Sequence, residues 1–140
     1  MIVEVCANSF QSALNAQDAG ADRIELCSEL AVGGITPNYG LLKKVTSDLK
    51  IPVHVLIRPR RGNFVYTPEE VKTTATQIEI AKSLGADGIV MGALNEDHSL
   101  PLTTLKNWVK MAHPLDLTFH RAFDRILQPK ESLKLSLIHI

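Results

Sequence analysis

This sequence of 140 residues has no long apolar run and no net charge, and it contains only two cysteines. A membrane-spanning helix takes roughly 18 or more consecutive apolar residues, and no run approaches that length, so we expect no membrane partner. The 15 basic residues balance the 15 acidic ones, which argues against nucleic-acid binding driven by charge. The first residues lack the pattern of a signal peptide, so we expect none. Because the two cysteines form no disulfide framework, we expect a reducing, cytoplasmic location.

The glycine motifs of nucleotide-binding folds are also missing. No G-x-G-x-x-G or P-loop pattern follows any expected strand, so we expect no nucleotide cofactor. The sequence is otherwise that of a globular protein, with 45% hydrophobic and 21% charged residues. A chain of this length is long enough for one core and too short for two ordinary domains, so residues 1–140 are expected to form a single domain.

The first 28 residues hold one pattern twice. Two short runs rich in β-branched residues, at 2–7 and 23–28, each contain Glu-X-Cys. Between them, apolar positions at helical spacing predict a helix over residues 9–20. A strand, a helix and a second strand in so short a stretch predict two parallel neighbouring strands.

The remaining chain continues this alternation of strands and helices. We expect strands at 53–58, 88–94 and 115–122, and helices at 40–49, 68–84, 102–111 and 129–140. Ala19-Gly20-Ala21-Asp22 recurs as Leu84-Gly85-Ala86-Asp87, at the distance of two βα units. Five such units predict an α/β fold, either a doubly wound sheet or part of a (β/α)8 barrel. The missing nucleotide motifs favour the barrel.

Six segments, taken in order along nearly the whole chain, resemble the CutC copper-homeostasis family. They are 4–9, 20–28, 33–37, 57–60, 92–94 and 118–124. The resemblance implies a TIM-type (β/α)8 barrel, a cytoplasmic location and homo-oligomers. It also implies copper handling, with Cys6 and Cys27 as the Cu(I) ligands, and it attaches no firm enzymatic reaction. Family members are longer than this chain, so we expect a truncated barrel of about five βα units.

The chain departs from the family pattern in three places. Arg61 and Asn63 stand in the loop after the third expected strand, where the family usually has glycine and aspartate. Glu29 and Val32 depart in the loop after the second strand, and His98 replaces a common glycine. Arg61 is interpreted as part of a solvated loop.

Cys6 and Cys27 have two interpretations. Free cysteine is among the most buried residue types, so both fit small apolar core positions. The repeated Glu-X-Cys pattern and the resemblance favour a metal site. Soft thiolates select Cu(I), and two of them suit it better than zinc, which takes four ligands in structural sites. Because both thiols occupy the same place in their repeats, we expect them to lie close together.

Charged residues inside parallel strands predict a polar pocket at the barrel mouth. Period-two alternation places Glu4 with Cys6 and Glu25 with Cys27, and an unpaired carboxylate is costly inside a barrel. We therefore expect Glu4, Glu25, Arg58 and His120 to converge, with Arg58 offsetting the two carboxylates. Arg121 and Asp124 extend this set. The alternative is a structural ion network with no ligand, and His54 is interpreted as a core histidine.

Two functions from different classes follow. One is a copper-homeostasis protein that binds or transfers Cu(I) through Cys6 and Cys27. The other is a barrel enzyme acting on a small polar or anionic substrate, with Glu25, Arg58 and His120 as candidate catalytic residues. Fold class alone does not choose between them. An incomplete barrel also leaves strand edges and apolar surface uncovered, so we expect an oligomer or a marginally stable chain.

Overall fold

The computed structural model describes residues 1–139, with side chains described for residues 1–134. Strands and α-helices alternate along this part of the chain. The strands are β1 (Glu4–Ala7), β2 (Arg23–Leu26), β3 (Val53–Leu56), β4 (Gly88–Met91) and β5 (Asp116–Phe119). The α-helices are α1 (Phe10–Asp18), α2 (Tyr39–Asp48), α3 (Pro68–Ser83), α4 (Leu102–Ala112) and α5 (Pro129–His139). Two short 3₁₀ helices are η1 (Leu30–Val32) and η2 (Arg121–Arg125).

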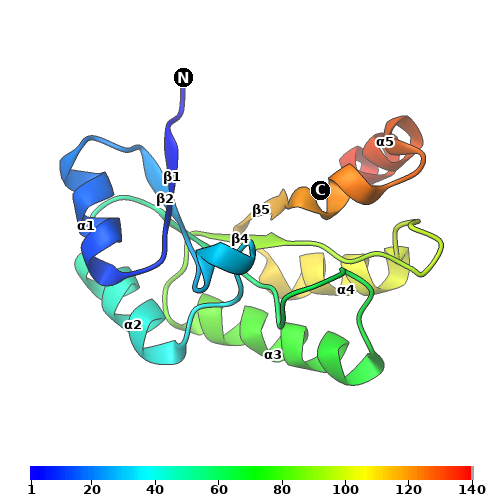
Figure 1. Ribbon diagram of the computed structural model, residues 1–140, viewed down its shortest axis with the longest axis horizontal. Coiled ribbons are helices and arrows are strands. Elements are labelled where there is room, and N and C mark those ends of the chain that lie inside the picture. Colours follow the sequence, from blue (N-terminus) through cyan, green and yellow to red (C-terminus); the bar gives the residue numbers. More distant parts are fainter. Residues whose placement is uncertain (140) are drawn as a thin grey trace.

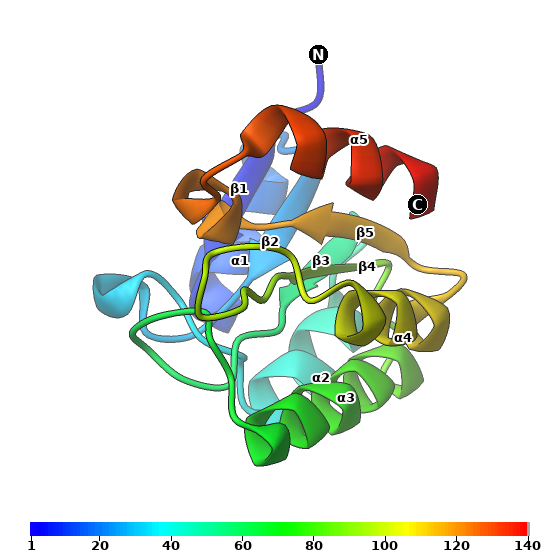
Figure 2. The ribbon, with the colours of Figure 1, turned by 90° about the vertical axis from the view of Figure 1, so that its right-hand side faces the viewer.

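The strands form one parallel sheet in the order β1-β2-β3-β4-β5. Figures 1 and 2 show helices α1 to α4 along one face of this sheet, while the other face is left concave. Strands in chain order with helices on a single face are typical of a (β/α)8 barrel, because a doubly wound sheet carries helices on both faces. The predicted α/β fold of TIM-barrel type is confirmed, and so are its five βα units.

The main apolar core lies between the sheet and the helices. The strand residues that face the helices, such as Ile24, Val55 and Ile89, are fully buried. Ile78 of α3 and Trp108 of α4 belong to the same buried core and cover these strand residues from the helix side. None of the described helices combines the length and the apolar character that crossing a bilayer requires.

The repeated Gly-Ala-Asp segments have a structural explanation. Gly20 and Gly85 end their helices at φ of +86° and +87°, a conformation that favours glycine. The carboxylate of Asp22 then accepts a hydrogen bond from the backbone N–H of Val3 at 2.6 Å. The carboxylate of Asp87 accepts one from Val53 at 2.8 Å. Each repeat therefore ties the start of one strand to the start of the strand before it.

The strands end earlier than the sequence predicts, and both 3₁₀ helices were missed. Residues 27–28, 57–58, 92–94 and 120–122 lie beyond the ends of β2 to β5. At the end of β5, the His120 side chain accepts a hydrogen bond from the backbone N–H of Ala122 and begins η2. Such a side-chain cap stops a strand without the glycine or proline that marks a turn in a sequence.

Candidate functional site

The concave face of the sheet gathers the polar strand residues predicted for the barrel interior. Cys6 and Glu25 point to this face and are direct cross-strand neighbours. Cys27, Arg58 and His120 line the same cavity from positions just beyond the ends of β2, β3 and β5. Because parallel strands run in one direction, these side chains gather at the carboxyl ends, where barrel proteins carry their sites.

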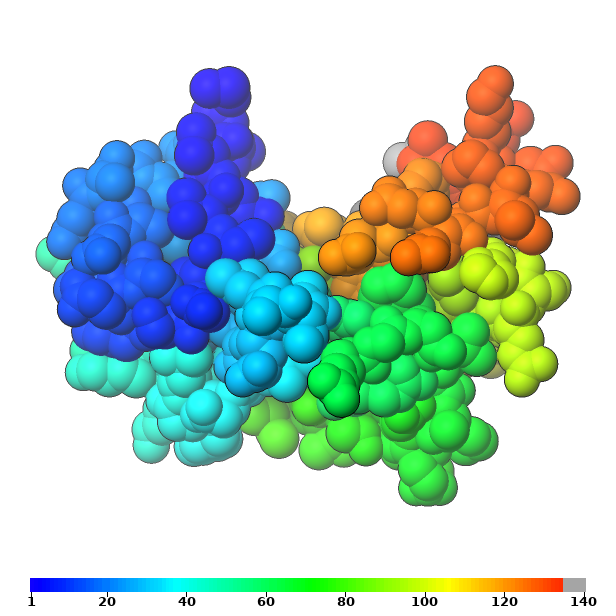
Figure 3. All heavy atoms as spheres, viewed as in Figure 1, coloured from blue at the N-terminus to red at the C-terminus, as the bar shows by residue number. Residues whose placement is uncertain are grey.

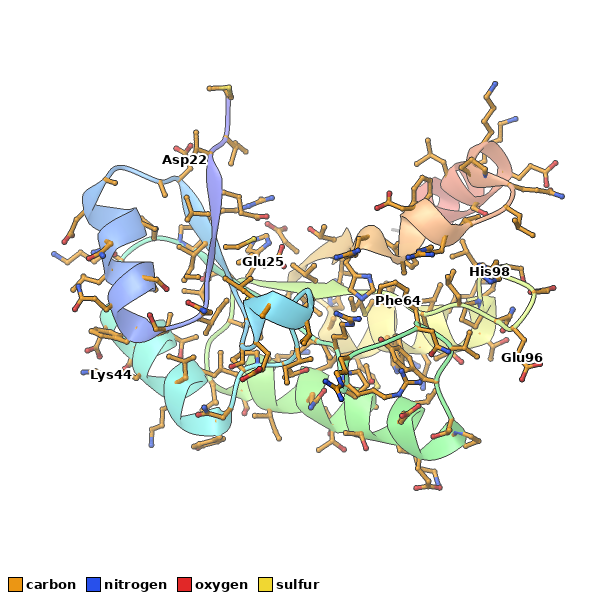
Figure 4. All side chains as sticks on the ribbon, viewed as in Figure 1. Asp22, Glu25, Lys44, Phe64, Glu96 and His98 are labelled. Atoms are coloured by element: carbon orange, nitrogen blue, oxygen red, sulfur yellow. The ribbon has the colours of Figure 1, made fainter. Side chains whose placement is uncertain are left out.

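A cavity of about 290 Å³ lies at these carboxyl ends. Figure 3 shows the molecule hollowed between the N-terminal segment and the segment after β5, and Figure 4 shows Glu25 and Phe64 on opposite sides of that hollow. The polar residues lining the cavity are Cys6, Glu25, Cys27, Arg58, Thr118, His120 and Arg121. Its apolar lining includes Leu56, Phe64 and Val90. Within the described side chains, Glu4 and Asp124 do not line this cavity.

The two cysteines line the same cavity but are not direct cross-strand neighbours. The strand register pairs Cys6 with Glu25, so Cys27 lies two residues past the partner of Cys6, just after the end of β2. Diagonal neighbours of this kind lie roughly 7–8 Å apart between their Cα atoms. Each thiol ends a Glu-X-Cys repeat, and this equivalence predicts a shorter distance between the two cysteines. The strands pair at an offset of 19 residues, from Glu4 to Arg23, whereas the repeat has an offset of 21, from Cys6 to Cys27.

The environments of the two thiols differ. Cys6 is exposed, whereas Cys27 is buried against Leu56 and Val90, and its thiol donates to the carbonyl of Ala7 at 3.7 Å. Burial raises the pKa of Cys27 to about 11, with smaller contributions from Cys6 and Glu25. Burial also raises the pKa of Cys6, followed by the effects of Glu25 and Glu4. Both groups are therefore protonated thiols at neutral pH.

Arg23 has the role that the sequence analysis gave to Arg58. The Arg23 guanidinium donates to the Glu4 carboxylate and forms an ion pair with it. Burial raises the pKa of Glu25, Glu4 raises it further, and Arg23 lowers it. The prediction that Arg58 offsets the two carboxylates is wrong.

Arg58 instead holds two loops together. Its side chain is buried, and Nη1 donates to the carbonyls of Val32, Gly33 and Gly34 at 2.9–3.3 Å. Nη2 donates to the carbonyl of Gly62 at 2.8 Å. The loop that follows β2 and the loop that follows β3 are thereby joined over the cavity. No carboxylate in the described part of the chain forms an ion pair with Arg58, so its charge stays uncompensated.

His120 is a neutral donor in the cavity wall. Its Nδ1 accepts from the N–H of Ala122 at 3.2 Å, which leaves the proton of the neutral ring on Nε2. Burial, followed by the charge of Arg58, lowers the pKa of His120 to about 4. The Nε2 atom is buried and has no hydrogen-bond partner among the described residues. The ring packs beside Phe64, with 4.9 Å between centroids.

His54 lies on the same concave face, toward the amino ends of the strands. It is 1% exposed, which agrees with its interpretation as a core residue. Its ring nitrogens lie 4.0 Å from the Glu4 carboxylate and 3.8 Å from that of Asp116. Burial lowers the pKa of His54, and Arg23 lowers it further, so the ring is a neutral spacer between carboxylates of β1 and β5.

The sequence model of the CutC family matches residues 1–139. The chain belongs to the CutC family. It is 46% identical over 133 residues to the human copper homeostasis protein cutC homolog, covering 95% of this chain and 49% of that protein. It is 45% identical over 134 residues to a CutC family protein of Histophilus somni, covering 96% of this chain and 55% of the relative. The chain thus spans about half the length of these relatives.

Solved structures agree with the CutC assignment. The crystal structure of a CutC protein from Streptococcus agalactiae superposes with a TM-score of 0.91 at 35% identity, over 99% of this chain and 69% of that one. A thiamine phosphate pyrophosphorylase from Pyrococcus furiosus is similar with a TM-score of 0.53 at 19% identity, over 80% of this chain and 48% of that one. The second likeness shows the fold alone.

The CutC name raises the question of which side chains fit copper. Within the described residues, no three His, Cys, Asp or Glu side chains are placed to hold a metal ion together. Cys6 and Cys27 are the thiols that line one cavity, and a pair of soft sulfur ligands suits Cu(I). Their diagonal placement requires the side chains to turn toward each other across the strands.

Sequence reasoning missed the residues that make room for the site. Gly88 and Gly92 lie on the concave face of β4 and just after it, against the rings of His54 and His120. Phe64 forms the apolar wall under the Arg58 guanidinium, 5.0 Å from the ring centroid to Cζ. A usable signal for the glycines was their spacing of four in a strand pattern, which puts both on one face. Phe64 follows a loop of charged residues and carries no comparable signal.

Proposed function

We propose that this chain binds copper as Cu(I) through Cys6 and Cys27 and takes part in copper homeostasis, the function for which its relatives are named. The observation that supports this most directly is that both thiols line one cavity at the carboxyl ends of neighbouring strands. Thiolates are soft ligands, and Cu(I) is the soft ion that they select. Copper is the cargo here, and the residues supply the ligands.

The raised pKa values of both thiols fix how binding should depend on pH. A metal binds the thiolate, so each ligand must lose a proton, and a raised pKa makes that loss more costly at neutral pH. Apparent Cu(I) affinity should therefore increase as the pH rises from neutral values. Protons should be released as the ion binds.

The test is a Cu(I) titration in competition with a chelator under anaerobic, reducing conditions. The wild-type chain should bind about one equivalent, and the Cys6→Ser, Cys27→Ser double variant should lose it. Each single variant separates the exposed ligand from the buried one. Circular dichroism of the double variant controls for folding. A double variant that is folded and binds Cu(I) as tightly as the wild type would rule out the thiol site.

A second candidate function is a barrel enzyme, and a specific observation favours it. Burial raises the pKa of Glu25 and lowers that of His120, and both line one cavity with Arg58. Titratable groups whose pKa values are shifted from their ordinary values and that share one cavity are candidates for acid–base roles. NMR of small polar and anionic metabolites mixed with the chain tests for turnover. Activity that persists in a folded Glu25→Gln variant would remove Glu25 from the catalytic set.

The assembly and the location belong to the same proposal. We propose a cytoplasmic homo-oligomer in which residues 1–140 form one domain. The exposed apolar side chains of Ile2 and Val3, just before β1, and of Val5 within β1 support self-association. The two unpaired thiols fit a reducing compartment. Analytical ultracentrifugation over a range of concentrations tests the assembly, and a monomer at all concentrations would contradict it.

A further inference from the structure

A cationic site lies at the rim of the cavity, formed by residues from three loops. A Cβ built on Gly33 would lie 3.0 Å from Nη1 of Arg121 and 3.3 Å from Nη1 of Arg58. Two guanidinium groups therefore approach the same glycine from the segments that follow β5 and β3. Their mutual repulsion is visible in Arg58, whose pKa is lowered first by burial and also by Arg121.

The two arginines differ in the number of hydrogen bonds that their guanidinium groups form. The terminal nitrogens of Arg58 donate to backbone carbonyls and are fixed by them. Arg121 is exposed, and within the described chain it makes no hydrogen bond or ion pair. Guanidinium groups hold carboxylate and phosphate oxygens in a fixed fork geometry. Arg121 is therefore a charged donor group that lines a cavity without a partner.

A second unpaired donor lines the same cavity. His120 is 9% exposed, its Nδ1 is occupied by Ala122, and its Nε2–H has no acceptor among the described residues. A buried donor without an acceptor is destabilising, so an acceptor atom from a ligand would be favourable there. The Thr118 hydroxyl, also in the lining, is able to donate as well.

We infer that this cavity binds a small molecule through an oxyanion, a carboxylate or a phosphate group, held by Arg121, His120 and Thr118. Arg58 adds its uncompensated charge and holds the loops that shape the rim. The space of about 290 Å³ limits the ligand to a small molecule, and Leu56, Phe64 and Val90 give it an apolar wall. This site does not depend on copper.

Glu25 lies in the same lining. A carboxylate repels an oxyanion, and the amide of glutamine carries no charge. The Glu25→Gln variant should therefore bind the anion at least as tightly as the wild type.

The test titrates the 140-residue chain with inorganic phosphate and, separately, with acetate at constant ionic strength, followed by amide chemical shifts. We expect saturable binding of at least one anion, with shifts around residues 33, 118 and 120–122. Arg121→Gln should weaken binding by about tenfold or more. His120→Asn keeps an acceptor for the Ala122 N–H and loses the Nε2–H, so it should weaken binding as well. Arg61→Gln, outside the cavity, is the matched control and should bind as the wild type does.

The outcomes separate this site from the copper proposal. The Cys6→Ser, Cys27→Ser variant should keep its anion affinity, and Arg121→Gln should keep its Cu(I) affinity. Tighter binding of phosphate than of acetate, or the reverse, identifies the group that the ligand carries. Failure of both anions to saturate, equal shifts with chloride, or unchanged affinity in a folded Arg121→Gln variant would each overturn the inference.

Discussion

The imidazole of His54 lies directly on the Cα of Gly88, its partner across the β3–β4 ladder. A Cβ on Gly88 would come within 2.6 Å of three ring atoms. The same relation recurs beyond the end of β4, where a Cβ on Gly92 would lie 2.7 Å from the ring of His120. Glycine at these two positions therefore leaves room for the imidazole rings of His54 and His120 on the concave face.

Gly88→Ala should destabilise the chain because the new methyl group meets a buried ring that has little room to move. Overpacking of this kind typically costs about 1–3 kcal/mol, measured as the change in the free energy of unfolding in urea. Gly40→Ala is the control. Gly40 is exposed in α2 with only an ordinary contact to Asn38 nearby, so alanine should stabilise there by about 0.5–1 kcal/mol. A Gly88→Ala variant as stable as the wild type would contradict the packing described here.

Arg58→Ala should be strongly destabilising because it removes the donors that bind four loop carbonyls. We expect a loss of about 2–4 kcal/mol in the free energy of unfolding. Arg61→Ala should stay within about 0.5 kcal/mol, since that residue is exposed on the loop. Equal effects of the two substitutions would show that the Arg58 contacts contribute little.

His120 should make stability fall in acid. The pKa of His120 is about 4 in the folded state, against an ordinary value of 6.5. Between these two pH values the imidazole is protonated in the unfolded chain and neutral in the folded chain. This stability is fully present above pH 6.5 and is lost as the pH falls toward 4, by roughly 2–3 kcal/mol. Urea unfolding at several pH values measures it. The His120→Asn variant should show a shallower decline over that window, and an identical decline would refute the assignment.

Glu25→Gln should stabilise the chain at neutral pH. A raised carboxyl pKa favours folding below the ordinary value of 4.5, and the advantage is lost as the pH rises through the folded pKa. At pH 7 the Glu25 carboxyl therefore destabilises the fold, and the neutral amide that replaces it should add about 0.5–1 kcal/mol. The gain should disappear at low pH. Thermal unfolding of both proteins at acid and neutral pH checks the sign.

The two cysteines should react at different rates with a thiol reagent such as a disulfide dye. Cys6 is exposed, whereas Cys27 is buried with a pKa of about 11. The Cys27→Ser variant, which retains Cys6, should react about tenfold or more faster than the Cys6→Ser variant. Equal rates in denaturant provide the control. Equal rates in the native chain would mean that Cys27 is not protected.

Residue types and their periodicity determine much of this fold in advance. Thr67 and Glu70 have the residue types and the spacing of a capping box at the start of α3, and both of its hydrogen bonds form. Alternation assigned Glu25, Cys27 and Arg58 to the concave face, and all three line the cavity there. A face is a local property of a strand, so a local pattern is sufficient to assign it.

The partners of those side chains were less predictable. Arg58 was expected to bind carboxylates, yet it binds loop carbonyls, and every residue carries a carbonyl whatever its type. The stagger of Cys6 and Cys27 depends on the register between β1 and β2, which a repeat within the sequence does not specify. The cap that His120 forms at η2 depends on where a strand stops rather than on composition.

The carboxylates of Asp22 and Asp87 each fasten a strand to the one before it, β2 to β1 and β4 to β3. Gly-Ala-Asp precedes β2 and β4, so the same three residues end a helix, turn the chain and anchor the next strand at both places. The sheet is thereby cross-linked through side chains at its amino-terminal edge, the edge opposite the cavity. A substitution of either aspartate would loosen one strand pair without touching the residues that line the cavity.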